Sequence, residues 1–386
     1  MDRLREGHAR TWFSRGDLAV LLATLLLLLL LGFVRPVRGE AAAGDEGATP
    51  PVEMTPEEMI LEFPQDPYGL RPQPPSACEI PCRVLDPLDQ CPLWTGRAEA
   101  LMLWWDGPQS TPLFNAAPAS SGVVALDAAS LNSPMAAGPR FSLFRHTGDT
   151  GQIEFTYFFI DGFTAANTLP ATTGGYVVSP GVLCCSPVTR LNEASAALGS
   201  SIQSFELNRR LPTAGRWQWL AGFRWVQWNE DLAMDAVTSL SDPLAIRSDT
   251  NNDLYGMQIG ADTFLWGNGG PFWIEGIGKA GLFYNRSAQF TSYTLGGPQP
   301  EFAAGGTNTS RAAFVGELGA TAVWQMNDWL ALRLGWVAFW LGGLAQAPNQ
   351  LDNNCLLCDD SLQTLATDTG GSVFVNGLTL GLEARW

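Results

Sequence analysis

The chain has 386 residues with 22 basic and 38 acidic side chains, giving a formal net charge of -16. So few basic residues argue against nucleic-acid binding as the function. Charged residues make up 16% of the chain, aromatic residues make up 11%, and there are 41 glycines. This composition suits a sheet protein with an apolar exterior.

Residues 1–43 have the pattern of a secretory signal peptide. Arginines precede an apolar stretch at 18–34, and small residues such as Gly39 and Ala41 follow it. We therefore predict export through a cleaved signal. The apolar stretch is also long enough to leave an uncleaved membrane anchor open as an alternative.

Residues 44–93 are rich in proline and acidic side chains, which predicts a periplasmic linker without a packed core. Seven cysteines follow the signal and would meet an oxidising compartment, which favours disulfides over a metal site. A bridge between the adjacent Cys184 and Cys185 would be strained, so we expect a link from this pair to Cys355 or Cys358. An odd count leaves at least one cysteine free or paired with another chain. The disulfide candidates are Cys78, Cys82, Cys91, Cys184, Cys185, Cys355 and Cys358.

From residue 94 onward, segments that alternate apolar with polar or small side chains recur between turn signals, which is the pattern of β-strands. The count of ten is open within the range 8–14, since 139–145 is weak and 288–295 could add a strand. The predicted strands are 94–105, 139–145, 152–159, 201–209, 217–228, 252–265, 272–285, 311–325, 330–341 and 374–386.

Short and long connections take turns along the chain. The short ones are 146–151, 211–215, 267–270 and 326–328, and the long ones are 106–138, 160–200, 229–251, 286–310 and 342–372. A soluble β-sandwich has no reason to show this order. It predicts an all-β fold: a transmembrane, antiparallel, up-and-down barrel over residues 94–386 in the bacterial outer membrane, with short turns and both barrel ends in the periplasm.

The last predicted strand ends the chain on an aromatic residue. Its apolar face predicts a signal for the barrel-assembly machinery and a closing pair with the first strand, which would leave no free sheet edge. The signal residues are Phe374, Leu378, Leu380, Leu382 and Trp386. Aromatic residues near strand ends predict two girdles against outer-membrane lipid: Trp94, Trp104, Tyr157, Trp217, Trp225, Trp228, Tyr284, Trp324, Trp340 and Trp386.

On the same alternation, seven acids and six bases face the lumen and nearly cancel. Opposing walls of a narrow barrel lie within side-chain reach, so we expect these charges to pair. They are either a charged channel constriction or a salt-bridged plug that supports the wall. The lumen-facing charges are Arg97, Glu99, Arg140, Glu154, Glu206, Arg224, Asp262, Glu275, Lys279, Glu317, Arg333, Glu383 and Arg385.

The remaining acids are expected in solvated outer loops, one at 229–251 and another that includes Asp352. No metal site is predicted: the spacing of Asp249, Asn251 and Asp253 resembles half a calcium loop but lacks its glycine and its distal glutamate. The histidines are His8, in the signal, and His146, in a short turn. No serine–histidine–acid group can be assembled at the outer loops, so the sequence predicts neither an enzyme nor a cofactor.

The order of several motifs resembles the β-barrel porin family seven of bacterial outer-membrane proteins. The motifs are Arg-Ala-Glu-Ala-Leu-Met-Leu-Trp-Trp at 97–105, Glu-Leu-Asn-Arg-Arg at 206–210, Leu-Ala-Gly-Phe-Arg-Trp at 220–225, Asn-Asp-Leu-Tyr-Gly-Met-Gln-Ile-Gly at 252–260 and Gly-Lys-Ala-Gly at 278–281. The resemblance implies a porin, but it brings no substrate and no site residue.

We therefore expect passive passage of ions or very small solutes. The alternative is a structural or surface-interaction barrel with a plugged lumen and acidic outer loops. The oligomeric state stays open.

Overall fold

The computed structural model describes residues 92–118, 121–179, 190–212, 215–267, 269–298, 300–353 and 365–386. The predicted signal, almost all of the predicted linker and all seven cysteines lie outside these residues, as do the disulfide predictions made for them. In the described part, no helix is both long and apolar enough to cross a membrane.

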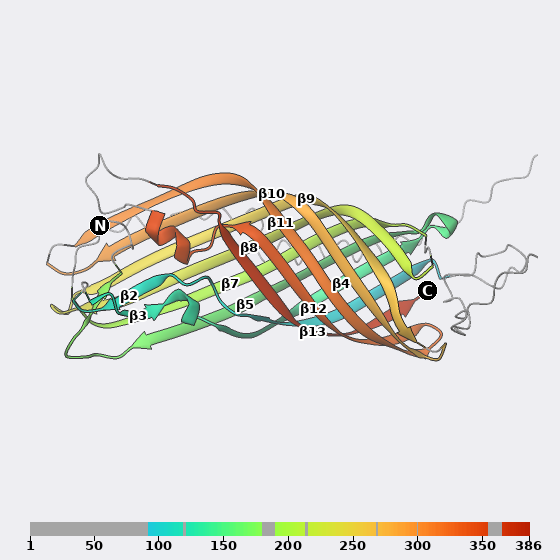
Figure 1. Ribbon diagram of the computed structural model, residues 1–386, viewed down its shortest axis with the longest axis horizontal. Coiled ribbons are helices and arrows are strands. Elements are labelled where there is room, and N and C mark those ends of the chain that lie inside the picture. The colour runs from blue at the N-terminus through green and yellow to red at the C-terminus, as the bar shows by residue number, and fades with distance from the viewer. Residues whose placement is uncertain are drawn as a thin grey trace, which may run out of the picture. The chain divides into compact units, whose positions relative to one another are not determined.

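Ten antiparallel strands form a closed barrel, which confirms the predicted fold class and strand count (Figure 1). They are β1 (Trp94–Trp105), β4 (Ser133–His146), β5 (Gln152–Leu169), β7 (Leu191–Arg210), β8 (Trp217–Thr238), β9 (Pro243–Gly267), β10 (Phe272–Leu295), β11 (Glu301–Asn327), β12 (Leu330–Leu344) and β13 (Gly371–Arg385). Each strand pairs with the next one along this series, and β7 pairs with β8.

The barrel closes where β13 pairs with β1. The register runs from Thr95 opposite Arg385 to Trp105 opposite Val375. Beyond it, Trp94 and Trp386 exchange two backbone hydrogen bonds, of 2.9 and 3.0 Å. The first and last strands therefore cover each other's edges, as their sequence alternation predicts.

The longer connections between barrel strands contain short strands and 3-10 turns. Between β1 and β4 lie β2 (Pro112–Ala116), β3 (Val124–Asp127) and the 3-10 turn η2 (Ala128–Ser130); between β5 and β7 lies β6 (Tyr176–Val178). Strand β2 pairs with β3 and β6, and β6 touches β7 at Tyr176 opposite Leu191. Two further 3-10 turns are η3 (Gly148–Thr150) and η4 (Pro348–Asn353).

Two of the predicted long loops are wrong. Residues 229–251 and 286–310 belong mostly to β8, β9, β10 and β11, whose hairpins turn at 239–242 and 296–300. The inward alternation continues through Glu230, Leu232 and Met234, all at most 2% exposed. The outward-facing side chains become polar there, and this change made the sequence of these stretches resemble that of loops. The predicted acidic loop at 229–251 is therefore strand wall, and Glu230 points inward.

These strands are much longer than a bilayer crossing requires. Strand β11 has 27 residues and β9 has 25, against about 9–11 for a tilted transmembrane strand. Trp225, Tyr255 and Tyr284 form one row on neighbouring strands. Beyond that row the outward side chains are polar, such as Gln227, opposite Asp253. The row fits a membrane boundary, beyond which the wall continues into water.

Most predicted girdle residues do face outward, but Trp228 does not. Trp104, Trp217, Tyr284, Trp324, Trp340 and Trp386 are 39–58% exposed. Trp228 is 0% exposed and packs edge-on against Trp105, with ring centroids 5.2 Å apart. It stands three residues after Trp225, and in a strand an odd spacing places two side chains on opposite faces.

Closure of the β1–β13 seam is expected to depend on Gly377. A Cβ at this position would overlap the carbonyl oxygen of Met102 on β1, while a Cβ at Gly342 would meet nothing within 4 Å. We predict that Gly377→Ala lowers the yield of folded barrel and that Gly342→Ala leaves it unchanged. Heat-modifiable migration on gels measures the folded fraction. Equal yields for both variants would contradict this account of the seam.

Candidate functional site

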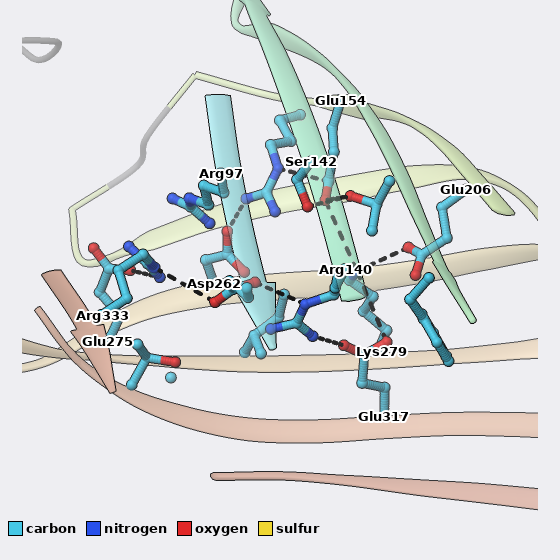
Figure 2. Close-up of a pocket in the computed structure, with 17 residues that line it drawn as sticks. Arg97, Arg140, Ser142, Glu154, Glu206, Asp262, Glu275, Lys279, Glu317 and Arg333 are labelled. Atoms are coloured by element: carbon cyan, nitrogen blue, oxygen red, sulfur yellow. Dashed lines mark hydrogen bonds and ion pairs between the residues drawn. The ribbon is translucent and has the colours of Figure 1, made fainter. Parts of the chain in front are cut away.

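The lumen contains a network of charged side chains from all ten barrel strands, in the half of the barrel that carries the short turns and the backbone pair of Trp94 with Trp386. Figure 2 shows these groups pointing toward one another from several strands. They surround a cavity of about 60 Å³, which is room for a few water molecules. Of the thirteen predicted lumen-facing charges, Arg224, Glu383 and Arg385 do not line this cavity, but each is ion-paired inside the barrel.

One part of the network centres on Glu383 of β13. Its carboxylate accepts hydrogen bonds from Arg97 at 2.7 Å, from Arg333 at 2.9 Å and from Arg385 at 2.8 Å. Arg333 also donates to Glu275 on β10, at 2.9 Å. One glutamate thus ties β13 to β1 and β12, and through Arg333 to β10.

A second part joins strands that face each other across the lumen. Arg224 of β8 donates to Glu317 of β11 at 2.8 Å, and Lys279 of β10 donates to Glu206 of β7 at 2.8 Å. Arg140 of β4 donates to Glu99 on the adjacent strand β1 at 2.7 Å and is ion-paired across the lumen with Glu317 at 3.9 Å. The acid that hydrogen-bonds Arg224 lies three strands away, and Arg224 is also ion-paired, at 3.5 Å, with Glu206 on the neighbouring strand β7.

Sequence reasoning missed one base of the network, Arg210. The predicted strand stopped at residue 209, whereas β7 runs to Arg210. Arg210 is 3% exposed, donates to Glu154 at 2.8 Å and is ion-paired with Asp262. Its parity with Glu206 and Asn208 would have identified it. With Arg210, seven bases face seven acids, so the network is formally neutral.

An aromatic layer closes the lumen above the charges. Phe158 of β5 and Phe339 of β12 meet with ring centroids 5.3 Å apart, although these strands stand nearly opposite in the wall. The guanidinium of Arg224 lies 5.7 Å from the Phe339 ring centre. Farther out, Trp105, Trp228 and Phe163 pack together. In the described conformation, side chains of opposite walls touch and the lumen is filled at this level.

The outermost part of the lumen is occupied by residues 345–351, which follow β12. We call this stretch the plug segment. Its residues 345, 346, 347, 350 and 351 are fully buried. It contacts the inward side chains of β8, β9 and β10, including Asn252, which donates to the Ala345 carbonyl at 2.8 Å. Glu230 accepts a hydrogen bond from the Ala347 amide at 2.8 Å and another from the Trp228 indole at 2.7 Å.

Glu230 lies beyond the row of Trp225, Tyr255 and Tyr284, outside the membrane-spanning part of β8. Burial raises the pKa of its carboxyl to about 7, and the neighbouring charge of Asp231 adds to the rise, while the hydrogen bonds that the carboxyl accepts, above all that from the Trp228 indole, oppose it. The carboxyl is therefore poised to change charge near neutral pH.

His146 and the metal candidates stand apart from the network. The His146 ring nitrogen Nε2 lies 3.0 Å from the Thr95 hydroxyl, at the barrel end that carries the short turns. Asp249, Asn251 and Asp253 sit on β9, well outside any loop. Within the described residues, no cluster of histidine, cysteine, aspartate or glutamate is arranged to hold a metal ion.

Comparison with known proteins finds likeness at the level of fold. No family model matches the chain, so the resemblance to porin family seven gains no support there, and no curated protein matches it either. Among solved structures it is similar to the outer membrane protease OmpT from Escherichia coli, with 10% identity and a TM-score of 0.41, covering 76% of this chain and 96% of that one.

Two further barrels are similar. The translocator domain of the autotransporter NalP from Neisseria meningitidis has 9% identity and a TM-score of 0.35, covering 76% of this chain and 88% of that one. The toluene transporter TodX of P. putida has 7% identity and a TM-score of 0.20, covering 76% and 90%. All three are outer-membrane barrels of different activity, and at these values none assigns a residue role or a substrate to this chain.

The prediction that the chain is not an enzyme is corrected by these comparisons. A structure to which it is similar is a protease, so a barrel of this class is compatible with catalysis. The argument from missing histidines considered only one type of catalytic site, and histidine is not the one residue that can act as an acid or a base.

Arg210→Ala should destabilise the barrel by about 3–5 kcal/mol, because it leaves Glu154 buried beside one cation fewer. The matched control is Arg247→Ala, which removes the exposed pair with Asp235, 42% and 53% exposed, and should cost at most about 1 kcal/mol. Urea unfolding in lipid vesicles compares the two variants. A loss below 1 kcal/mol for Arg210→Ala would show that the network does not hold the wall.

The pKa of Glu230 predicts a dependence of stability on pH. Between about pH 4.5 and 7 the folded chain keeps a proton that the unfolded chain has lost, so the free energy of unfolding should fall as the pH rises, by about 3 kcal/mol, and level off above pH 7. Glu230→Gln should remove this component. Urea midpoints at several pH values test it, and identical slopes for the two proteins would contradict the assignment.

Proposed function

We propose that the protein is an integral barrel of the bacterial outer membrane that passes ions or very small solutes, and that the conformation described here is its closed state. The membrane location is supported by the outward side chains. Met257, Ile259 and Leu282 are 65–77% exposed, a pattern that suits contact with lipid tails far better than contact with water.

The buried charge network carries the proposal. A wall that needed only a filled interior would be as stable, or more so, with apolar side chains, because desolvation of paired charges offsets most of their attraction. Fourteen linked charged groups, eleven of them around a shared cavity, exceed what such support requires. Charged rings at a constriction are how channels select ions. The small cavity limits passage to ions or very small solutes.

A structural or surface-interaction barrel is the second candidate. The contacts across the lumen, from Phe158 to Phe339 and from Trp105 to Trp228, favour it because they leave no open path in this conformation. In this case the tall polar wall beyond the membrane would be the working surface, exposed to partners in the surrounding medium.

Several partners belong to the same proposal. The outward faces of Leu378, Leu380, Leu382 and Trp386, 43–58% exposed, suit both outer-membrane lipid and recognition by the barrel-assembly machinery. Export would use the predicted signal at 1–43. The resemblance to porin family seven supports passage over the structural alternative.

Replacing both Arg224 and Arg333 by Ala should raise single-channel conductance in planar bilayers and favour cations, because bulk leaves the constriction and Glu317, Glu383 and Glu275 each lose one cationic partner. Wild type should show small, infrequent currents, and Arg247→Ala should match wild type. A large, stable wild-type conductance comparable to a general porin would rule out the narrow lumen. Silence in every form would favour the structural barrel.

A further inference from the structure

Just before the end of β12, the register against β13 shifts at Gly343, between Gly342, opposite Ser372, and Leu344, opposite Gly371. Gly343 has a positive φ of 84°, and a Cβ there would lie 2.9 Å from the carbonyl oxygen of Ala312. Its neighbour Gly342 has open space where a Cβ would be. Glycine adopts such a conformation without steric cost. Gly343 therefore accommodates this irregularity, and the chain leaves the wall for the lumen directly after Leu344, the last paired residue of β12.

Wall side chains hold the plug segment, in place of a strand ladder. The amide of Asn252 accepts from the Ala345 N–H and donates to the Ala345 carbonyl, both at 2.8 Å. Ser248 donates to the Ala347 carbonyl at 3.0 Å, and Asn285 donates to the Gly343 carbonyl at 2.8 Å. These contacts can break while every strand of the barrel keeps its own backbone partners.

The wall behind the plug segment is polar, unlike the rest of the outer lumen. Eight adjoining inward side chains carry hydroxyl, amide or carboxyl groups: Glu230, Ser248, Thr250, Asn252, Asn285, Ser287, Gln289 and Thr291, all at most 4% exposed. We call this set the polar strip. Most other inward positions at this depth, such as Leu103, Trp105 and Phe163, are apolar and belong to the core, although Ser200, opposite Glu230, is polar.

The closed arrangement leaves part of the polar strip without partners. Among the residues that the structure describes, the Thr250 hydroxyl oxygen and the Asn285 carbonyl oxygen are buried with no hydrogen-bond partner. A buried polar atom in this state is costly, whereas water would satisfy it. A wall meant to stay covered would be more stable if apolar, so the polar strip suits a surface that becomes wet.

We propose that residues 345–351, which follow the last paired residue of β12, are a releasable plug held by Asn252 and its neighbours, and that its movement opens the outer lumen to water along the polar strip. This inference deepens the proposed passage function by naming what regulates it. Small hydrated ions or uncharged polar solutes would then reach the aromatic layer and the charge network below.

The test is hydrogen exchange of the full-length protein in lipid nanodiscs. In wild type, the amides of Ala345 and Ala347 should exchange faster than those of β12. Asn252→Leu removes both bonds to Ala345 and should speed exchange of the plug segment about tenfold or more, with β12 unchanged. The matched control is Asn251→Leu, the outward neighbour on the same strand, which should behave as wild type.

The proposal would be overturned if the plug amides exchanged no faster than the β12 amides, both in wild type and in Asn252→Leu. Should Asn252→Leu fail to fold, Ser248→Ala and the wild-type rates give the same decision. Bilayer currents recorded on the same samples separate the two proposals. Fast exchange of the plug amides with no current in any variant would refute the passage function but leave the releasable plug supported. Current without fast exchange of the plug amides would refute the releasable plug.

Discussion

The pairing of β13 with β1 is the constraint on which the rest of the molecule depends. It removes the two free edges of a ten-stranded sheet and so produces an inside and an outside. Strand alternation then sorts side chains between them: Leu380 and Leu382 face outward, while Glu383 faces the lumen with at most 1% of its surface exposed. Without closure, neither a lipid-facing surface nor a site for buried charge would exist.

A barrel of ten strands is narrow, and narrowness explains the chemistry of its interior. Opposite walls lie within side-chain reach, so Arg224 can meet Glu317 three strands away, and Phe158 can meet Phe339. Apart from Arg385, which pairs with Glu383 of its own strand, each charge is stabilised because a partner from another strand is close enough to offset its desolvation. The network therefore links strands that are not neighbours, and a pore here requires that some of these contacts exchange partners.

Much of the architecture follows from the alternation of apolar and polar side chains alone, because a period of two residues indicates both that a segment is a strand and which face each side chain lies on. The ten strands and the inward direction of residues such as Glu99 and Lys279 come from that rule. The same rule would have placed Arg210 and Trp228 on the inward face. Arg210 was missed because the predicted strand ended one residue early, and Trp228 was misplaced because aromatic residues were grouped by their position along the strand. The full length of β8 to β11 was not predicted because the outward side chains of these strands become polar beyond the lipid-facing region. The plug segment could not be predicted, since its contacts with Asn252 and Glu230 join residues about a hundred positions apart and follow no local pattern.

The most direct measurement of the central claim, a narrow lumen that is closed at rest and passes only very small solutes, is liposome swelling with solutes of graded size. The account predicts slow swelling in a solute as small as glycine and none in a disaccharide. Rapid swelling in disaccharides would contradict it, because the charge network and the aromatic layer could not then fill the lumen as described.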